Sequence, residues 1–411
     1  MKLNTLILSS AASLALLAGG ATAEDLTVWT LSYSSEKQSL AFKLAEEAFE
    51  AQNPDDNVEV IHRGTDEHKT ALRVAAGSDT GPDVYTMWAG LGLGGEYVNA
   101  GLSLDLTKYY EKYGWADRVS VPSQAFVEAY ADGKHGAPYR FSGEAVYYDQ
   151  TIFDEVGIDK EPETYEELKA AAVKLKENGY AAFTFGGAVN WHVMRLMDVL
   201  LETTCGAEKH DALTSMELDW ATEPCAEAAF AEMKWWADDY ILAPFMGIDE
   251  KQASTLWYAK RAAMMLEGDW MVNAIDENAD VSEYGIFPFP TGTNRLYGFA
   301  EYLYVSSKSK NPDLAAEFVD MFISTPFQSK INGSFGALSV NKDVKLGDDA
   351  MDLHKEWIEI FDAAGGTFVN GDQAFPLAVT TEYFRIINEV ASGEMEPKSA
   401  AEAMATFIGN L

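Results

Sequence analysis

The sequence predicts an α/β protein of two domains, and three observations lead to that prediction. The first part of the chain alternates apolar, strand-like runs with amphipathic helices in the order β-α-β-α-β, which is the pattern of a doubly wound sheet. The length of 411 residues exceeds what one hydrophobic core usually supports. Two stretches rich in proline and glycine, residues 133–139 and 284–292, have the composition of connections between domains.

The first 23 residues have the features of a secretory signal peptide. Lys2 supplies the positive start, residues 6–17 form the apolar stretch, and Ala21, Thr22 and Ala23 form a small-residue cleavage site. We therefore expect cleavage after Ala23 and a periplasmic product. No later apolar run reaches the roughly 20 residues that span a bilayer, so direct membrane insertion is not expected.

The elements of the first domain follow from hydrophobic periodicity and from helix-ending residues. In chain order we expect a strand over 26–29, a helix from 36 that Asn53 and Pro54 end, a strand over 58–61, a helix ending at Ala76, and a strand over 84–87. Three strand ends, at residues 32–36, 65–68 and 88–91, should then lie along one edge of the sheet. Ligands of open α/β sheets bind at this edge.

The third of these strands ends at an aromatic residue. Gly77 suits the cap of the preceding helix, Gly81 and Pro82 prevent its continuation, and Trp88 follows the strand. Trp88 is either a core residue or a platform on which a ligand ring stacks.

The rest of the chain continues the alternation of strands and helices. A capping box formed by Thr164 and Glu167 begins one helix, which Asn178 and Gly179 end. The other expected strands cover 145–148, 181–185, 262–266 and 301–306. The other expected helices are one that begins at 191, one that begins at 226, one that ends at 258, and those over 271–275, 311–324, 325–332, 352–363, 380–391 and 399–408. We also expect an extended segment over 335–340 and an irregular loop over 369–376.

The two cysteines, Cys205 and Cys225, are most simply a disulfide, because an exported protein meets an oxidising compartment. A redox or metal-binding pair is the alternative. The chain contains no Cys-x-x-Cys and no pair of histidines near these cysteines, so the sequence favours the structural bridge.

Composition and missing motifs exclude several functions. The formal net charge of −35 argues against nucleic acid and anionic membrane surfaces as partners. The chain has no nucleophile elbow, zinc-protease motif, P-loop or dinucleotide fingerprint, and its six histidines are scattered. We therefore expect no enzyme activity, no cofactor and no metal.

Aromatic residues recur where predicted strands end. Tyr33, Trp88, Trp191 and Trp270 all have small or polar neighbours. Pyranose rings have apolar faces that stack on aromatic rings and hydroxyl edges that need polar partners. Their recurrence at equivalent places indicates a sugar site.

Five segments together resemble family 1 of the extracellular solute-binding proteins of ABC sugar importers, the group that includes maltose- and trehalose-binding proteins. These segments are residues 75–84, 147–153, 162–168, 262–270 and 335–338. The resemblance implies a type II periplasmic binding protein fold: two α/β lobes, each a sheet flanked by helices, joined by three hinge crossings. Lobe 1 would comprise 24–137 and 291–324, and lobe 2 would comprise 138–290 and 325–411.

The resemblance also implies a monomer that holds a small carbohydrate in a cleft and passes it to an ABC transporter permease. The contact residues that it implies by position are Trp88, Arg140, Ser142, Gly187, Trp191, Gly268, Asp269, Trp270 and the loop 372–375, which includes Gln373 and Phe375. Further candidates, for hydroxyl or charged-group contacts at the strand ends of lobe 1, are Tyr33, Ser34, Glu36, Asp66 and Glu301. Arg140 would bind an acidic or sulfonated sugar, contact a hydroxyl, or form a salt bridge with Glu144. The alternatives for the whole protein are a receptor for a non-sugar ligand such as a polyamine, and a secreted carbohydrate-active enzyme.

Overall fold

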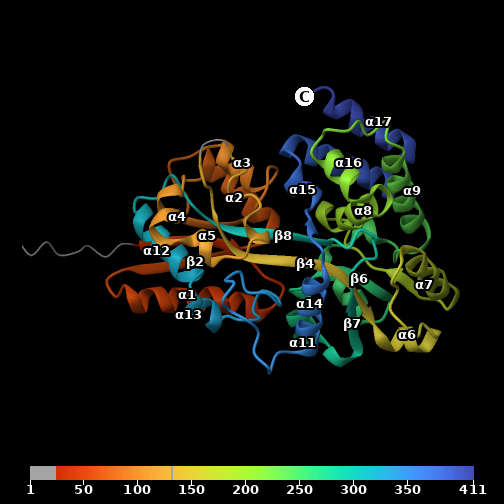
Figure 1. The fold of residues 1–411 in the computed structure, drawn as a ribbon, viewed down its shortest axis with the longest axis horizontal. Coiled ribbons are helices and arrows are strands. Elements are labelled where there is room, and N and C mark those ends of the chain that lie inside the picture. The colour runs from red at the N-terminus through yellow and green to blue at the C-terminus, as the bar shows by residue number, and fades with distance from the viewer. Residues whose placement is uncertain (1–24, 131–132) are drawn as a thin grey trace, which may run out of the picture.

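Two α/β lobes lie side by side in the computed structural model, which describes residues 25–130 and 133–411 (Figure 1). Strands β4 (Ala137–Asp149) and β8 (Leu296–Val305) run from one lobe into the other. The predicted fold class is confirmed. The predicted signal peptide, with its cleavage after Ala23, lies outside the described residues. Among the described helices, none combines the length and apolar composition needed to cross a membrane.

One nine-stranded sheet passes through both lobes in the order β2-β1-β3-β8-β4-β6-β5, with β7 beside β4 and β9 beside β8. In lobe 1, β1 (Asp25–Leu31) pairs in parallel with β2 (Asn57–Arg63) and β3 (Val84–Trp88), as expected from the βαβ pattern. In lobe 2, β5 (Ala181–Phe183) pairs in parallel with β6 (Ala262–Gly268). The carboxyl ends of β1 and β3 therefore meet at one edge of lobe 1.

The strands that join the lobes are longer than the sequence predicted. The expected strands covered only 145–148 and 301–306, whereas β4 has 13 residues and β8 has 10. Every residue of both strands is buried, so neither shows the alternation of exposed and buried positions that marks a strand. The two strands that run through both lobes thus form one antiparallel pair.

Three other segments also differ from expectation. The predicted connector contains β7 (Tyr284–Phe287), and the predicted loop contains the short helix α15 (Gly371–Ala374). Residues 335–340 form a series of bends rather than an extended segment. These segments are short, so their period carries little information, and their structure depends on contacts with the rest of the protein.

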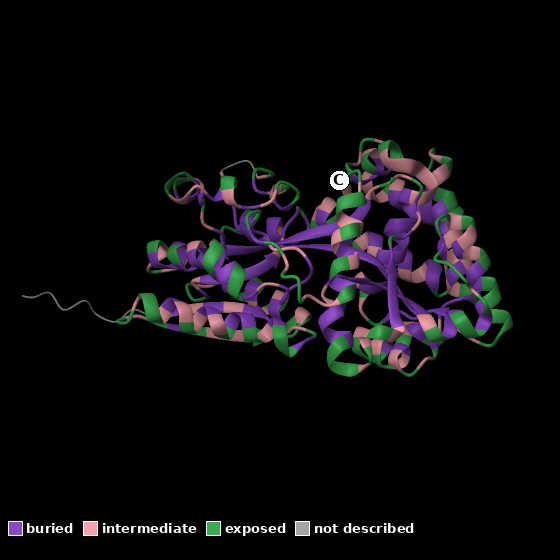
Figure 2. Cartoon of the chain, turned by 60° about the horizontal axis from the view of Figure 1, so that its bottom comes forward, coloured by how far each residue is buried: buried purple, intermediate pink, exposed green. Residues whose placement is uncertain are grey.

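Helices cover both faces of the sheet in each lobe, and their buried sides face the strands (Figure 2). Ser35 caps α1 because its Oγ accepts the Gln38 N–H at 3.2 Å. The helices of lobe 1 are α1 (Glu36–Gln52), α2 (Thr65–Ala76), α3 (Gly94–Asn99), α4 (Thr107–Tyr113), α5 (Trp115–Arg118), α12 (Pro312–Phe322) and α13 (Thr325–Lys330).

The predicted capping box is present at the start of α7 in lobe 2. The Thr164 side chain accepts the Glu167 N–H, and the Glu167 side chain accepts the Thr164 N–H. The helices of lobe 2 are α6 (Gln150–Val156), α7 (Tyr165–Glu177), α8 (Asn190–Thr214), α9 (Pro224–Asp239), α10 (Glu250–Tyr258), α11 (Met271–Asn278), α14 (Asp352–Ala363), α15, α16 (Leu377–Ala391) and α17 (Pro397–Ile408), and β9 is Thr367–Phe368. The predicted disulfide is also confirmed: Cys205 and Cys225 are bonded and join α8 to α9.

The packing of two segments differs from the lobe boundaries drawn from the sequence. Phe327 and Phe335 lie in the hydrophobic core of lobe 1, although residues from 325 onward were assigned to lobe 2. Leu296 and Tyr297 pack with cores of lobe 2, although 291–324 were assigned to lobe 1. The reason for the second difference is that β8 passes from one lobe to the other along its own length.

Candidate ligand-binding site

A cavity of about 180 Å³ lies between the lobes, and both of them supply its wall. Lobe 1 contributes the segment that leaves β1, the start of α2 and the end of β3. Lobe 2 contributes α8, α10, the end of β6 and the segment around α15. Because the parallel strands β1 and β3 end at this edge, the cavity lies where ligands of open α/β sheets are expected.

All four aromatic residues singled out in the sequence line this cavity: Tyr33, Trp88, Trp191 and Trp270. Each side chain is half-buried. The Tyr33 hydroxyl is held 2.9 Å from Thr30 Oγ1. The four residues that the sequence pattern singled out thus belong to one wall.

Arg140 is paired at the base of the cavity, where β4 meets β8. Its Nη1 donates to Glu301 Oε1 at 3.0 Å and its Nε donates to Ser142 Oγ at 2.8 Å. Nη2 lies 3.9 Å from Asp269 Oδ1. Arg140 and Glu301 are register partners on neighbouring strands, which places their side chains within reach of each other.

One of the three alternatives for Arg140, a salt bridge with Glu144, is wrong, because Arg140 pairs with Glu301 and Asp269. Residues four apart on a strand are separated by roughly 13 Å, too far for their side chains to meet. Glu144 Oε2 lies instead 3.0 Å from Arg195 Nε.

Arg195, on α8, lines the cavity and was not predicted. Its Nη1 donates to Glu267 Oε2 at 2.5 Å. Its guanidinium carbon lies 4.6 Å from the centre of the Trp191 ring and 5.1 Å from that of Trp270. The guanidinium carbon of Arg140 lies 5.0 Å from the Trp270 ring, so Trp270 has two guanidinium groups beside it.

The buried carboxylates beside the two arginines have pKa values displaced in opposite directions. Burial would raise the pKa of Glu267, but Arg195 and His192 lower it to about 2. Burial outweighs Arg195 at Glu144 and raises its pKa to about 8. Burial likewise outweighs Arg140 at Asp269 and raises that pKa to about 7. Arg195 and His192 thus favour the charged form of Glu267, whereas burial favours the neutral form of Glu144.

Lys69, which was not predicted, and Asp372, which begins the predicted contact loop 372–375, form another part of the wall. Lys69 Nζ lies 5.2 Å from the centre of the Trp88 ring, and burial lowers the Lys69 pKa against the opposing effect of Asp372. Burial raises the pKa of Asp372 against the effect of Lys69. Each group thus partly offsets the pKa shift that burial imposes on the other.

The predicted residues divide into those that line the cavity, those that contact the lining side chains from behind, and those that lie elsewhere. Tyr33, Ser34, Trp88, Arg140, Trp191, Trp270, Glu301 and Gln373 line the cavity. Ser142 and Asp269 are fully buried and contact Arg140. A Cβ on Gly268 would lie 1.8 Å from the Trp270 ring, so glycine is required for that ring to pack against β6.

Four predicted residues lie elsewhere. Gly187 packs against Met246. Phe375 is fully buried beside Trp220 and Tyr383. Asp66 lines a neighbouring hollow, and Glu36 lies in an open groove outside the cavity. The sequence placed these residues near the right strand ends but could not specify the direction of their side chains.

Glu36 takes part instead in a contact between the lobes. Glu277, on α11, accepts the Glu36 N–H at 2.9 Å and the Lys37 N–H at 3.4 Å. These amides begin α1, where a carboxylate is stabilised by free N–H groups and by the helix dipole. A carboxylate of lobe 2 therefore caps a helix of lobe 1.

These features define a class of protein: a two-lobed ligand-binding protein whose cavity lies between the lobes. The chain belongs to the bacterial extracellular solute-binding protein family, whose model matches residues 33–329. The family predicted from the sequence is thus confirmed, and it is a family of binding proteins.

Relatives and solved structures agree with this assignment. A binding protein of Brucella abortus is 26% identical over 342 residues, covering 80% of each chain. The multiple sugar-binding protein of Streptococcus mutans is 23% identical over 306 residues, covering 71% of this chain and 70% of that one.

Two solved structures share the fold. A chitin oligosaccharide binding protein matches with a TM-score of 0.86 at 21% identity, covering 95% of this chain and 99% of that one. A solute-binding protein in complex with raffinose matches with a TM-score of 0.75 at 17% identity, covering 94% of this chain and 99% of that one.

The raised pKa of Glu144 predicts a pH dependence of stability. Between its ordinary pKa of 4.5 and its folded pKa of about 8, the folded protein holds a proton that the unfolded chain releases. Stability from this group is therefore lost as pH rises through that range. Glu144→Gln should flatten the decline of the unfolding free energy between pH 5 and 8, by on the order of a few kcal/mol, in urea titrations.

The matched control for Glu144→Gln is Glu59→Gln, which removes an exposed carboxylate from β2. This control should keep the pH profile of the unmodified protein. Parallel profiles for Glu144→Gln and the unmodified protein would contradict the displaced pKa.

The Glu277 contact predicts that Glu277→Ala favours separation of the lobes. Loss of a carboxylate from a helix N-terminus costs about 0.3–1 kcal/mol, which is about a twofold to fivefold change in an equilibrium between arrangements. Small-angle X-ray scattering of the ligand-free protein should show a larger mean radius of gyration. Asp276→Ala removes a neighbouring charge that does not accept the α1 amides, and an equal effect of both variants would contradict the role of the contact.

Proposed function

We propose that the protein captures a sugar in the cavity between its lobes and delivers it to the permease of an ABC transporter. The observation that carries this proposal is that Trp88, Trp191, Trp270 and Tyr33 line one cavity together with charged side chains. Ligand binding would favour a closed arrangement of the lobes, which the permease would recognise. We also propose that the protein is a monomer located in the periplasm and that its signal peptide is cleaved after Ala23.

The hydrogen-bonding groups of the wall support a ligand with many hydroxyls. Arg140 Nη2, Asp372 Oδ1 and Gln373 Oε1 are buried and have no hydrogen-bond partner among the described residues. Unsatisfied buried groups of this kind are costly. Hydroxyl groups can satisfy all three, because each hydroxyl both donates and accepts.

The charges of the wall favour a neutral ligand. Four basic residues line the cavity, Lys69, Arg140, Arg195 and Lys251, and four acidic ones do, Glu250, Glu267, Glu301 and Asp372. Both arginines are already paired with carboxylates. A polyamine would meet the four basic residues, and an acidic sugar would compete with existing carboxylate partners, so neither has the support that a neutral sugar has.

The comparisons add support for a sugar. The solved structures that share the fold include a chitin oligosaccharide binding protein and a raffinose complex, and one relative is a multiple sugar-binding protein. Their ligands identify the class of molecule to test first.

A thermal-shift screen tests the proposal. Neutral monosaccharides and oligosaccharides, uronates, sulfonated sugars and polyamines are added to the protein, and a ligand that binds only the folded state raises Tm. We expect neutral sugars to raise it. A shift with polyamines alone would contradict the sugar assignment, and conversion of a bound sugar, detected by product analysis, would contradict a receptor without enzyme activity.

The position of Trp88 predicts the effect of removing one stacking surface. Trp88→Ala should weaken binding of the sugar with the largest thermal shift about tenfold, because a ring contact contributes about 1.4 kcal/mol. Calorimetric titration measures the affinity. The far-UV circular dichroism of the free protein should not change, since the Trp88 side chain is only half-buried.

Trp29→Ala is the matched control for Trp88→Ala. Trp29 is also half-buried in lobe 1 but lies beside Arg63, outside the cavity wall. Equal losses of affinity in the two variants would show that Trp88 acts through stability and not through contact with the sugar.

A further inference from the structure

One face of α8 carries four functional side chains in a row. Trp191, Arg195, Asp198 and Glu202 are spaced by four, three and four residues, which places them on the same side of a helix. The first two line the cavity. Asp198 and Glu202 do not, and they are buried within lobe 2.

The Asp198 carboxylate accepts three hydrogen bonds from three different elements. Its Oδ2 accepts the Tyr297 hydroxyl of β8 at 2.6 Å and the Gly371 N–H at 2.9 Å. Its Oδ1 accepts the Tyr383 hydroxyl of α16 at 2.9 Å. Asp198 therefore ties α8 to a strand, to a helix and to the first residue of α15.

The bond to Gly371 matters because the neighbours of Gly371 in the chain belong to the cavity wall. Residues 370–373, which we call the wall segment, place Asn370, Asp372 and Gln373 in that wall. The packing around Gly371 is close: a Cβ there would lie 2.8 Å from the Tyr383 ring and 3.1 Å from Asp198 Oδ1. The wall segment is thus anchored at Gly371 to the interior of lobe 2.

The other end of the wall segment reaches lobe 1. The Leu91 N–H donates to the Gln373 carbonyl oxygen at 2.7 Å. Gln373 Nε2 donates to the Ala300 carbonyl oxygen of β8 at 3.2 Å. A displacement of Gly371 would therefore move cavity side chains and disturb the contact with Leu91.

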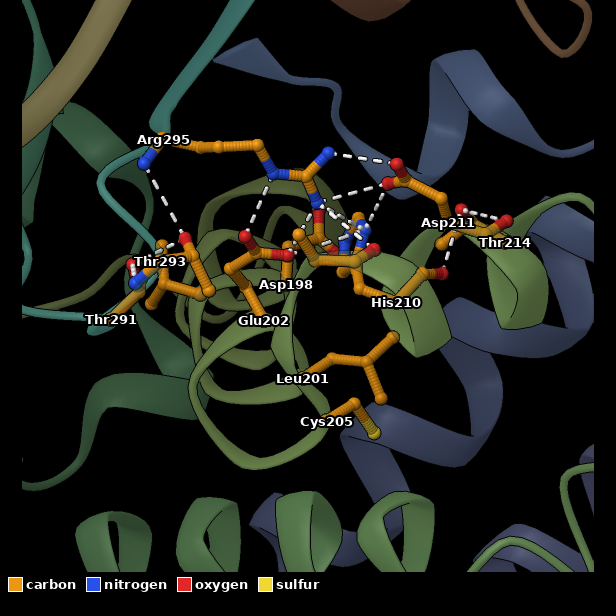
Figure 3. A network of polar contacts seen from close by, with 12 residues as sticks. Asp198, Leu201, Glu202, Cys205, His210, Asp211, Thr214, Thr291, Thr293 and Arg295 are labelled. Atoms are coloured by element: carbon orange, nitrogen blue, oxygen red, sulfur yellow. Dashed lines mark hydrogen bonds and ion pairs between the residues drawn. The ribbon is translucent and has the colours of Figure 1, made fainter. Parts of the chain in front are cut away.

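Glu202 has a different role, although it lies only one turn further along α8. It accepts Arg295 Nε at 2.9 Å and Nη2 at 2.7 Å, and Arg295 also donates to Asp211 (Figure 3). These bonds hold the chain just before β8. Figure 3 shows Arg295 extended across the helix toward Glu202 and Asp211.

We propose that Asp198 is a positioning residue for ligand binding: without touching the ligand, it holds the wall segment where Asn370, Asp372 and Gln373 can contact a sugar. The proposal rests on the proposed function, because the wall segment affects affinity only if the cavity binds the ligand. An aspartate suits this role because one carboxylate accepts all three donors, whereas an asparagine offers one acceptor oxygen.

Hydrogen–deuterium exchange tests the anchoring without any ligand. In the full-length protein, Asp198→Asn should speed exchange of the Gly371 amide at least tenfold, and a peptide spanning 368–376 reports it by mass spectrometry. Tyr383→Phe is the first control, because it removes one bond from the same carboxylate but keeps the Gly371 bond. Glu202→Gln is the second, because it removes a buried carboxylate from the same helix face.

The controls should keep the exchange rate of the unmodified protein in the 368–376 peptide, even where they lower Tm. An unchanged rate in Asp198→Asn would overturn the proposal, and so would equal acceleration in all three variants. Should Asp198→Asn fail to fold, Gly371→Ala displaces the wall segment by its Cβ contacts while Asp198 is retained, and it should speed exchange of the same peptide.

Affinity measurements with raffinose, chitobiose and xylobiose complete the test. For any of these that binds the unmodified protein, Asp198→Asn should weaken binding at least tenfold and Glu202→Gln less than threefold. Equal affinities in Asp198→Asn and the unmodified protein would overturn the positioning role. Failure of the unmodified protein to bind any sugar in the wider screen would contradict the proposed function instead, so the two failures are distinguishable.

Discussion

The pairing of Arg140 with Glu301 joins the architecture of the protein to its candidate site. The two residues are partners on β4 and β8, the antiparallel strands that run through both lobes. Their ion pair is buried at the base of the cavity, and such a pair is costly unless its geometry is good. Ser142 and Asp269 complete the surroundings of the guanidinium group. The floor of the cavity is thus built from the elements that hold the lobes together.

The sequence predicted the fold and singled out the aromatic residues that share one cavity wall, for a physical reason. Helix periods and short apolar runs are local signals, and Trp88 and Trp270 lie at the end of, or just after, strands that such runs mark. The charged part of the site was harder to predict from the sequence. Arg195 lies inside the apolar helix α8, and its role depends on carboxylates from β4 and β6. A row of polar residues at helical spacing within an apolar helix was the available signal.

Contacts between distant segments could not be predicted from local patterns. The strand β4 lacks alternation because it is buried on both faces, and the pairing of Glu144 with Arg195 follows from the arrangement of β4 and α8. Gly371 has its neighbours Asp198 and Tyr383 from two other helices. In each case the residue type was visible in the sequence, whereas its partner was set by tertiary structure.

The cap that Glu277 places on α1 has a consequence for how this protein can change over evolutionary time. The contact lies outside the cavity wall, yet it joins the lobes. In the closed arrangement that we propose, any free energy that this contact contributes is added to the binding of every ligand alike. Substitutions at Glu277 can therefore tune how much solute the protein retains at a given concentration without altering which solutes it distinguishes, so sensitivity and selectivity are encoded in separate residues.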